Sequence, residues 1–388
     1  MNPLLEAEQA LLGAVLLDPQ QLIHLSWLAP EHFYRPVHQA LFAALRKLRA
    51  DGHPALEGAD AVPLEWVTDA VEEAGLHVRG LTAVYAHTLI SACPRSGHAP
   101  VYARMVLEGA IHRTVTEHAI RLHQAARADA LQGEVENALH QADVLTGVLG
   151  DLAQRWGSEP RPMAPTGQPA PAPFSPPPGR AARIVEDERS LLAVLVEQPK
   201  AIDEVVGWLR PGDFAAPGHG QLYRCLGVLH HRGEPIDRMT VLWEAQRRGL
   251  LADGTLSAEE IGAICDGVGL GGADWLGEQI MRSSVTRTAA ASARAVRALA
   301  EDESLAPGRL IGHALHALGP LDEVRARWGT ANGHGAPVAP PPPVEEAAAA
   351  RVRAALARST SPTATRASVR PRPAPKPPAE RAPSRHHG

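Results

Sequence analysis

Apolar residues recur along the chain at helical spacing, and strand-like alternation is nowhere convincing. In the first stretch the apolar positions share one face of a helix with 3.6 residues per turn: Leu11, Leu12, Val15 and Leu16. We expect this helix to begin at Asn2-Pro3, because asparagine caps helices and proline fits the first turn. It should end at Asp18-Pro19. A second helix should then run to Pro30.

The same period predicts further helices over residues 36–52, 65–74, 81–92, 101–126, 134–154, 275–300 and 308–328. Alanine and leucine dominate the apolar residues, while aromatic residues make up 4% of the chain. This composition favours helices, since alanine and leucine lose little conformational freedom in them. The predicted fold class is all-α.

Proline divides the chain. A stretch at 158–183 holds nine prolines and should form an extended spacer, and a second break follows at 330–344. We therefore expect helical bundles at 1–157 and 184–329, a linker at 158–183, and a tail at 330–388. The tail should be mostly disordered, with one short helix at 345–358.

The two bundles are copies of one another. A shift of 181 residues aligns eleven identities across residues 27–54, where chance gives roughly two. They include Trp27 with Trp208 and His38 with His219. Further pairs follow in order, namely Glu8 with Glu188, Arg113 with Arg287, and Arg155 with Arg327. The sequence therefore predicts a tandem duplication of one helical unit, the first and second copy.

The charge is unevenly distributed. The net charge is −5, but residues 351–388 carry nine basic side chains and one acid, so the remaining 350 residues carry −13. Because an acidic body repels phosphate backbones, any DNA contact should involve the tail. Its candidate residues are Arg366, Arg370, Arg372, Lys376, Arg381 and Arg385. A merely solubilising tail explains the same composition.

The three cysteines, Cys93, Cys225 and Cys265, form no CxxC pair, which argues against a zinc framework or a disulfide scaffold. We expect no signal peptide and no membrane span, and therefore a cytoplasmic protein, with association with the nucleoid as an option.

Five short runs carry a family pattern: residues 6–13, 17–19 and 33–38 in the first copy, and 209–223 and 233–251 in the second. In these runs the sequence resembles the N-terminal domain of DnaB-type replicative helicases. The signature positions, to which we assign a structural role, are Glu8, Leu12, Pro19, Phe33, Pro36 and His38, and Glu188, Leu192, Pro199, Phe214, Pro217 and His219.

The resemblance implies two bundles of about six helices that work by protein–protein contact. In those helicases the domain forms a collar, receives primase and pairs through a terminal helical hairpin. The matching hairpins here, 101–154 and 275–328, have apolar residues on more than one face. Internal packing and pairing, with each other or with another chain, both remain open.

No part of the chain matches the nucleotide-binding pattern of a helicase motor. The pattern G-x-x-x-x-G-K-[ST] is absent, and none of the three lysines follows a glycine-rich loop. We therefore expect no catalytic residue, no cofactor and no metal site. His38 and His219 recur at matched positions, but no repeated carboxylate partner is evident at helical spacing, so we interpret them as buried or capping histidines.

These observations favour a non-catalytic accessory protein of DNA replication. Such a protein would bind the replicative helicase or primase, as part of a primosome, or would mimic paired helicase domains within one chain. The alternatives are a nucleic-acid-binding protein that acts through its arginine-rich tail, and a diverged structural scaffold.

Overall fold

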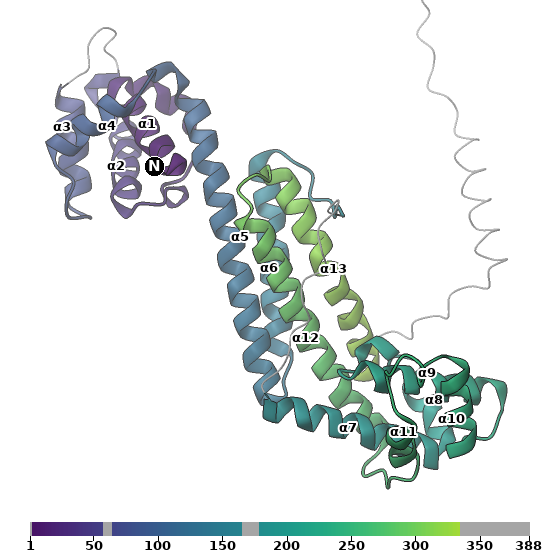
Figure 1. The fold of residues 1–388 in the computed structure, drawn as a ribbon. Helices are drawn as coiled ribbons and strands as arrows, with labels where there is room; N and C mark the ends of the chain where they lie inside the picture. The colour runs from purple at the N-terminus through teal and green to yellow at the C-terminus, as the bar shows by residue number, and fades with distance from the viewer. Residues whose placement is uncertain (1, 57–63, 165–177, 334–388) are drawn as a thin grey trace, which may run out of the picture. The chain divides into compact units, whose positions relative to one another are not determined.

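The computed structural model describes residues 2–56, 64–164 and 178–333 of the chain (Figure 1). Within these ranges the regular structure is helical throughout, and no strand occurs. The all-α class is therefore confirmed. The predicted helix at 345–358, the tail from residue 334 onward and residues 165–177 of the linker lie outside the described residues. The predicted break at 330–344 starts too early, because α13 continues to Ala331.

The first copy begins with a small head and ends in a long hairpin. The head consists of α1 (Pro3–Leu17), η1 (Pro19–Leu25), η2 (Pro30–His32), α2 (Pro36–Ala50), η3 (Pro54–Leu56), α3 (Leu64–Gly75), α4 (Ala83–Ala92) and η4 (Ser96–His98). The first hairpin consists of α5 (Ala99–Gln132) and α6 (Glu136–Trp156).

The predicted caps of α1 are confirmed. The Asn2 side chain accepts a hydrogen bond from the backbone N–H of Leu4 at 3.0 Å, and Asp18 ends the helix. The segment after Pro19 differs from the prediction, because it forms the 3₁₀ helix η1 rather than an α-helix. Asp18 caps it by accepting from the N–H of Gln20 at 3.1 Å.

The second copy repeats this order with a different set of short helices. Its head consists of α7 (Pro178–Glu197), η5 (Pro199–Ala201), α8 (Ile202–Val205), η6 (Pro211–Asp213), α9 (Pro217–Arg232), α10 (Arg238–Arg247) and α11 (Ala258–Cys265). The second hairpin consists of α12 (Ala273–Glu301) and α13 (Pro307–Ala331).

Helix α7 begins inside the predicted linker. The expectation of an extended chain up to residue 183 is wrong for residues 178–183, which are helical. The physical reason is the position of the last proline: Pro178 stands at the first residue of the helix, where its missing N–H has no intrahelical partner to lose. The residues from 179 onward carry no proline, so the helix can continue.

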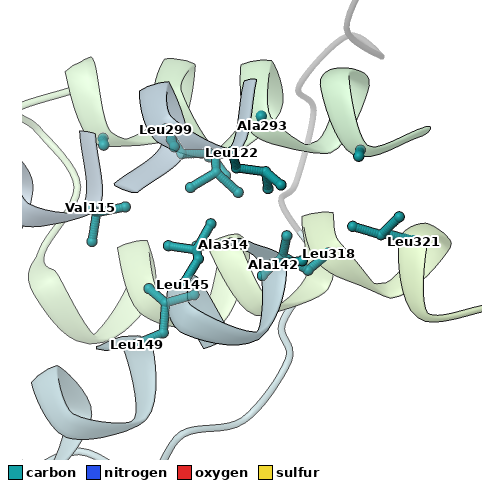
Figure 2. Packing of buried hydrophobic residues seen from close by; sticks show 14 of the residues in the cluster. Val115, Leu122, Ala142, Leu145, Leu149, Ala293, Leu299, Ala314, Leu318 and Leu321 are labelled. Carbon is teal, nitrogen blue, oxygen red and sulfur yellow. The ribbon is translucent and has the colours of Figure 1, made fainter. Parts of the chain in front are cut away.

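The two hairpins pack together as a four-helix bundle. The most extensive helix pairing joins α5 with α12, α6 packs on α13, and each hairpin also closes on itself. Figure 2 shows how leucines and alanines from both hairpins meet in the centre. The buried residues labelled there include Leu122 and Leu145 from the first hairpin, with Leu299 and Leu318 from the second. This double contact explains why the hairpin helices are apolar on more than one face.

Candidate functional site

Polar contacts fix the register of the paired hairpins. Arg325 on α13 donates to the Asp143 carboxylate at 2.6 Å and to the Leu139 carbonyl at 2.7 Å, both on α6. At the other side of the bundle, His112 on α5 lies between two carbonyl oxygens of the second copy. Its Nδ1 is 2.9 Å from Ala300 O, and its Nε2 is 3.0 Å from Leu305 O. These directional contacts allow one alignment of the apolar faces.

Each head contains a buried carboxylate–imidazole pair. In the first copy the Glu8 carboxylate accepts from His38 Nδ1 at 2.7 Å and from the backbone N–H of Tyr34. His38 Nε2 lies 2.7 Å from the Tyr85 hydroxyl, which itself accepts from Arg35 at 3.2 Å. The Glu8 and His38 side chains are both fully buried. The pair therefore joins α1, α2 and α4 inside the head.

The second copy repeats the pair with its own matched residues. His219 Nδ1 lies 2.9 Å from Glu188 Oε2. The same carboxylate accepts from the backbone N–H groups of Ala215 and Ala216. Burial with satisfied hydrogen bonds is the state in which a polar group stabilises a fold.

The repeated histidines thus have a repeated carboxylate partner, although it does not stand at helical spacing. The partner comes from another helix, about thirty residues earlier, and not from a neighbouring turn of the same helix. The signal was nevertheless present, because Glu8 and His38 recur together as Glu188 and His219. Their burial agrees with the interpretation of these histidines as buried side chains.

A second polar anchor ties each head to its hairpin. In the first copy Arg113 donates to the His32 carbonyl at 2.8 Å, and Arg155 Nη1 lies 3.3 Å from His32 Nε2. In the second copy the matched Arg287 donates to the Asp213 carbonyl, and Arg327 binds the Asp213 carboxylate.

His32 and Asp213 stand at the same position of the two copies. In the first copy His32 makes a weak polar contact with Arg155, and in the second copy Asp213 forms an ion pair with Arg327. Burial is the main cause that lowers the pKa of Arg287, against the raising influence of Glu188 and Asp213.

The signature residues predicted from the sequence are mostly parts of the core. The buried ones are Glu8, Leu12, Pro19, Phe33, His38, Glu188, Leu192, Phe214 and His219. Pro36 and Pro217 stand at the first residue of α2 and of α9, and Pro199 begins η5. The six candidate residues of the tail lie outside the described residues.

The described residues bring no three metal-ligating side chains together. Burial raises the pKa of the Cys225 thiol to about 11, and that of Cys265 to about 11 as well, so neither is a ready nucleophile at neutral pH. None of the helices over the described ranges is long and apolar enough to cross a membrane.

Glu8→Ala should lower the free energy of unfolding by about 2–4 kcal/mol, because it removes the acceptor of the fully buried His38 ring and that of the Tyr34 N–H. Urea denaturation followed by circular dichroism measures the change. Glu6→Ala, an exposed change on the same helix, is the matched control and should cost less than about 0.5 kcal/mol. Equal losses in the two variants would contradict the assigned role of Glu8.

Acid should destabilise the fold through His32. Burial lowers the pKa of His32 below the ordinary 6.5, and Arg155 and Arg113 lower it further while Glu31 opposes them. Each ring nitrogen faces a donor, the Ala29 N–H at 3.0 Å and Arg155 at 3.3 Å, so a protonated ring can accept from neither.

Since the unfolded chain binds the proton first, this contribution to stability is present above pH 6.5 and is lost as the pH falls below it. Unfolding free energies at pH 7.5 and 5.5 should differ less in His32→Gln than in the wild type; the same pH dependence in both proteins would refute the prediction.

The geometry defines a class of protein: two copies of one helical head-and-hairpin unit, paired through their hairpins in a single chain. The family model of the DnaB-like helicase N terminal domain matches residues 1–108 and 181–267, one match in each copy. The chain belongs to this family.

Curated relatives are replicative helicases longer than this match. The chain is 36% identical over 139 residues to the replicative DNA helicase DnaB of Mycobacterium leprae (strain TN), which is 36% of this chain and 22% of the relative. It is 34% identical over 142 residues to the replicative DNA helicase DnaB of Geobacillus stearothermophilus, or 36% and 29% of the two chains. For the replicative DNA helicase DnaC of Bacillus subtilis (strain 168) the identity is 33% over 155 residues, or 39% and 31%. The chain thus spans less than a third of the length of each of these relatives.

Proposed function

We propose that this chain is a non-catalytic accessory protein of DNA replication. It presents a ready-made pair of helicase-like N-terminal domains and binds the replicative helicase or primase through them. The single observation that carries the proposal is the packing of α5 and α6 on α12 and α13, which pairs the two copies within one polypeptide.

Intrachain pairing gives such a protein an advantage over two separate domains. A tether holds the second copy near the first at an effective concentration of roughly millimolar. The pair therefore survives dilution to levels at which separate domains would come apart. A partner that recognises the paired form meets it on every molecule.

The proposal of a non-catalytic role rests on the sequence. The 388 residues contain no G-x-x-x-x-G-K-[ST] segment to hold the phosphates of a nucleotide. The matched region of the family is the helicase N-terminal domain, which in the proposed role serves for protein contact.

Affinity purification from a native lysate of the source organism tests the proposal. The tagged full-length chain should retain the replicative helicase or primase, identified by mass spectrometry. Leu122→Asp, which places a carboxylate at the buried centre of the bundle, should lose that partner. Deletion of residues 345–388 should keep it. Preparations without helicase and primase, or retention unaffected by Leu122→Asp, would count against the proposal.

A second candidate function is DNA binding by the tail. It is favoured by the net charge of +8 over residues 351–388 against an acidic remainder. If the tail binds phosphate backbones, deletion of 345–388 should abolish DNA retention together with its dependence on salt. Binding of DNA by the deletion variant with the same salt dependence would exclude this function.

A further inference from the structure

A cavity of about 540 Å³ opens between the start of α1, the middle of α5 and the end of α12. One part of its wall is apolar and includes Pro3, Leu4, Ala7 and Met105. The other part carries four carboxylates, Glu108, Glu117, Glu301 and Glu303. Neither Glu8 nor His38 of the buried carboxylate–imidazole pair lines this cavity.

The duplication supplies a counterpart for this cavity in the second copy. The pairs Glu8 with Glu188 and Arg113 with Arg287 fix the register, so that Leu4 corresponds to Ile184. The counterpart is lined by Ile184 on α7, by Arg287 on α12 and by the end of α5. Its volume is about 20 Å³, so the same place in the fold is open in one copy and filled in the other.

Arginine side chains fill the counterpart. Arg282 on α12 donates to the Gly133 carbonyl at 3.0 Å. Arg180 on α7 lies so close to Gly133 that a Cβ there would be 2.8 Å from its Nη2. The carboxyl of Asp187 lines the same space, and Arg183 and Arg180 counteract the rise of its pKa caused by burial. The second copy thus shows which chemical group this place in the fold accepts: a guanidinium.

The first copy has the opposite charge at the matched position, because Glu108 stands where the second copy has Arg282. Two of the other charged groups of the wall already have hydrogen-bonded partners. Arg113 donates to the His32 carbonyl at 2.8 Å, and Glu301 pairs with Arg297 at 2.7 Å.

The remaining charged groups of the cavity wall are carboxylates, so this part of the wall is negatively charged. Glu117 has a looser neighbour, Arg121, at 3.7 Å with both side chains exposed, a contact of little energetic weight. His112 is held by the carbonyls of Ala300 and Leu305. The wall therefore offers an apolar surface beside Glu108, Glu117 and Glu303. It has no arginine at the position of Arg282, and its own arginine, Arg113, is engaged with the His32 carbonyl.

We propose that this cavity is a binding site for an arginine side chain of a protein partner. The methylene stem of that arginine would cover Leu4 and Met105, while its guanidinium would meet Glu108 and the neighbouring carboxylates. Guanidinium suits such a site, since it combines a weakly hydrated planar cation with several fixed donors. The site stands on the cavity and the internal comparison, and is independent of the proposed role in replication.

Methyl NMR of the full chain labelled at methionine tests the site. Met105 lines the cavity, while Met239 on α10 and the buried Met281 on α12 serve as internal references. Addition of N-acetyl-arginine amide should shift the Met105 methyl signal saturably, with a dissociation constant in the millimolar range, about −4 kcal/mol. The uncharged N-acetyl-citrulline amide should bind roughly tenfold more weakly or not at all.

The variant Glu108→Arg gives the first copy the residue type that the second copy has at the matched position, Arg282. It should abolish the shift of the Met105 signal, while the circular dichroism spectrum and the melting temperature stay as in the wild type. Glu72→Arg makes the same charge change on α3, away from the cavity, and should leave binding unchanged. The proposal is overturned by equal binding of the citrulline probe, by wild-type binding in a folded Glu108→Arg protein, or by the absence of a saturable Met105 shift.

Discussion

Asp213→Ala should lower the free energy of unfolding by about 3–5 kcal/mol, the range for removing one partner of a buried ion pair. Asp213 is 2% exposed, and its carboxylate accepts from both terminal nitrogens of Arg327 and from Ser284 at 2.8 Å. The substitution leaves the Arg327 guanidinium largely buried without its counter-ion. Denaturation in guanidinium chloride, with the slope compared as well as the midpoint, measures the loss.

The first copy provides the matched control for this experiment. His32→Ala removes the corresponding side chain, whose ring accepts from the Ala29 N–H at 3.0 Å and lies 3.3 Å from Arg155. We expect a cost of about 1–2 kcal/mol, because no buried ion pair is broken. An Asp213→Ala protein as stable as His32→Ala would show that the ion pair does not anchor the second head.

Leu122→Asp should separate the two hairpins. Leu122 is fully buried where the helices of both hairpins meet, among leucines and alanines of the two hairpins (Figure 2). A carboxylate there must either remain unpaired or take up a proton, so we expect a loss of roughly 4 kcal/mol or more. Limited proteolysis should then cut within α5 and α12, whereas we expect both helices to resist cleavage in the paired form.

Arg121→Gln is the control one residue earlier on α5. The Arg121 side chain is exposed, and Glu117 lies 3.7 Å from it. We expect a change within about 0.5 kcal/mol and an unchanged cleavage pattern. Wild-type protection in Leu122→Asp would mean that the hairpins do not depend on each other for stability.

Much of the fold could be predicted from the sequence, because the determinants were local. The period of the apolar residues gave the helices, and Asn2 and Asp18 gave the ends of α1. The limits of the linker were harder to predict. A helix can begin at a proline and continue after it, but a proline interrupts a helix that precedes it. Pro178 therefore reads as part of the spacer although it begins α7.

The polar anchors were harder to predict, because their partners are distant in sequence. Glu8 and His38 come from different helices, and only the duplication hinted that they belong together. The correspondence of His32 with Asp213 could not be found from identical residues in the two copies, since the two residues differ. The pairing of the hairpins could not be decided either, because an apolar face does not reveal which surface covers it.

Placing both partners of a symmetric pair in one polypeptide has an evolutionary consequence. In a homodimer encoded by one gene segment, every substitution appears on both sides of the twofold axis. In this chain each copy accumulates substitutions independently. The second copy therefore has a side-chain salt bridge at Asp213 where the first has His32, and the first has an open cavity where the second is filled. A symmetric ancestor could have used its two faces only for the same task; this chain is free to assign them different ones.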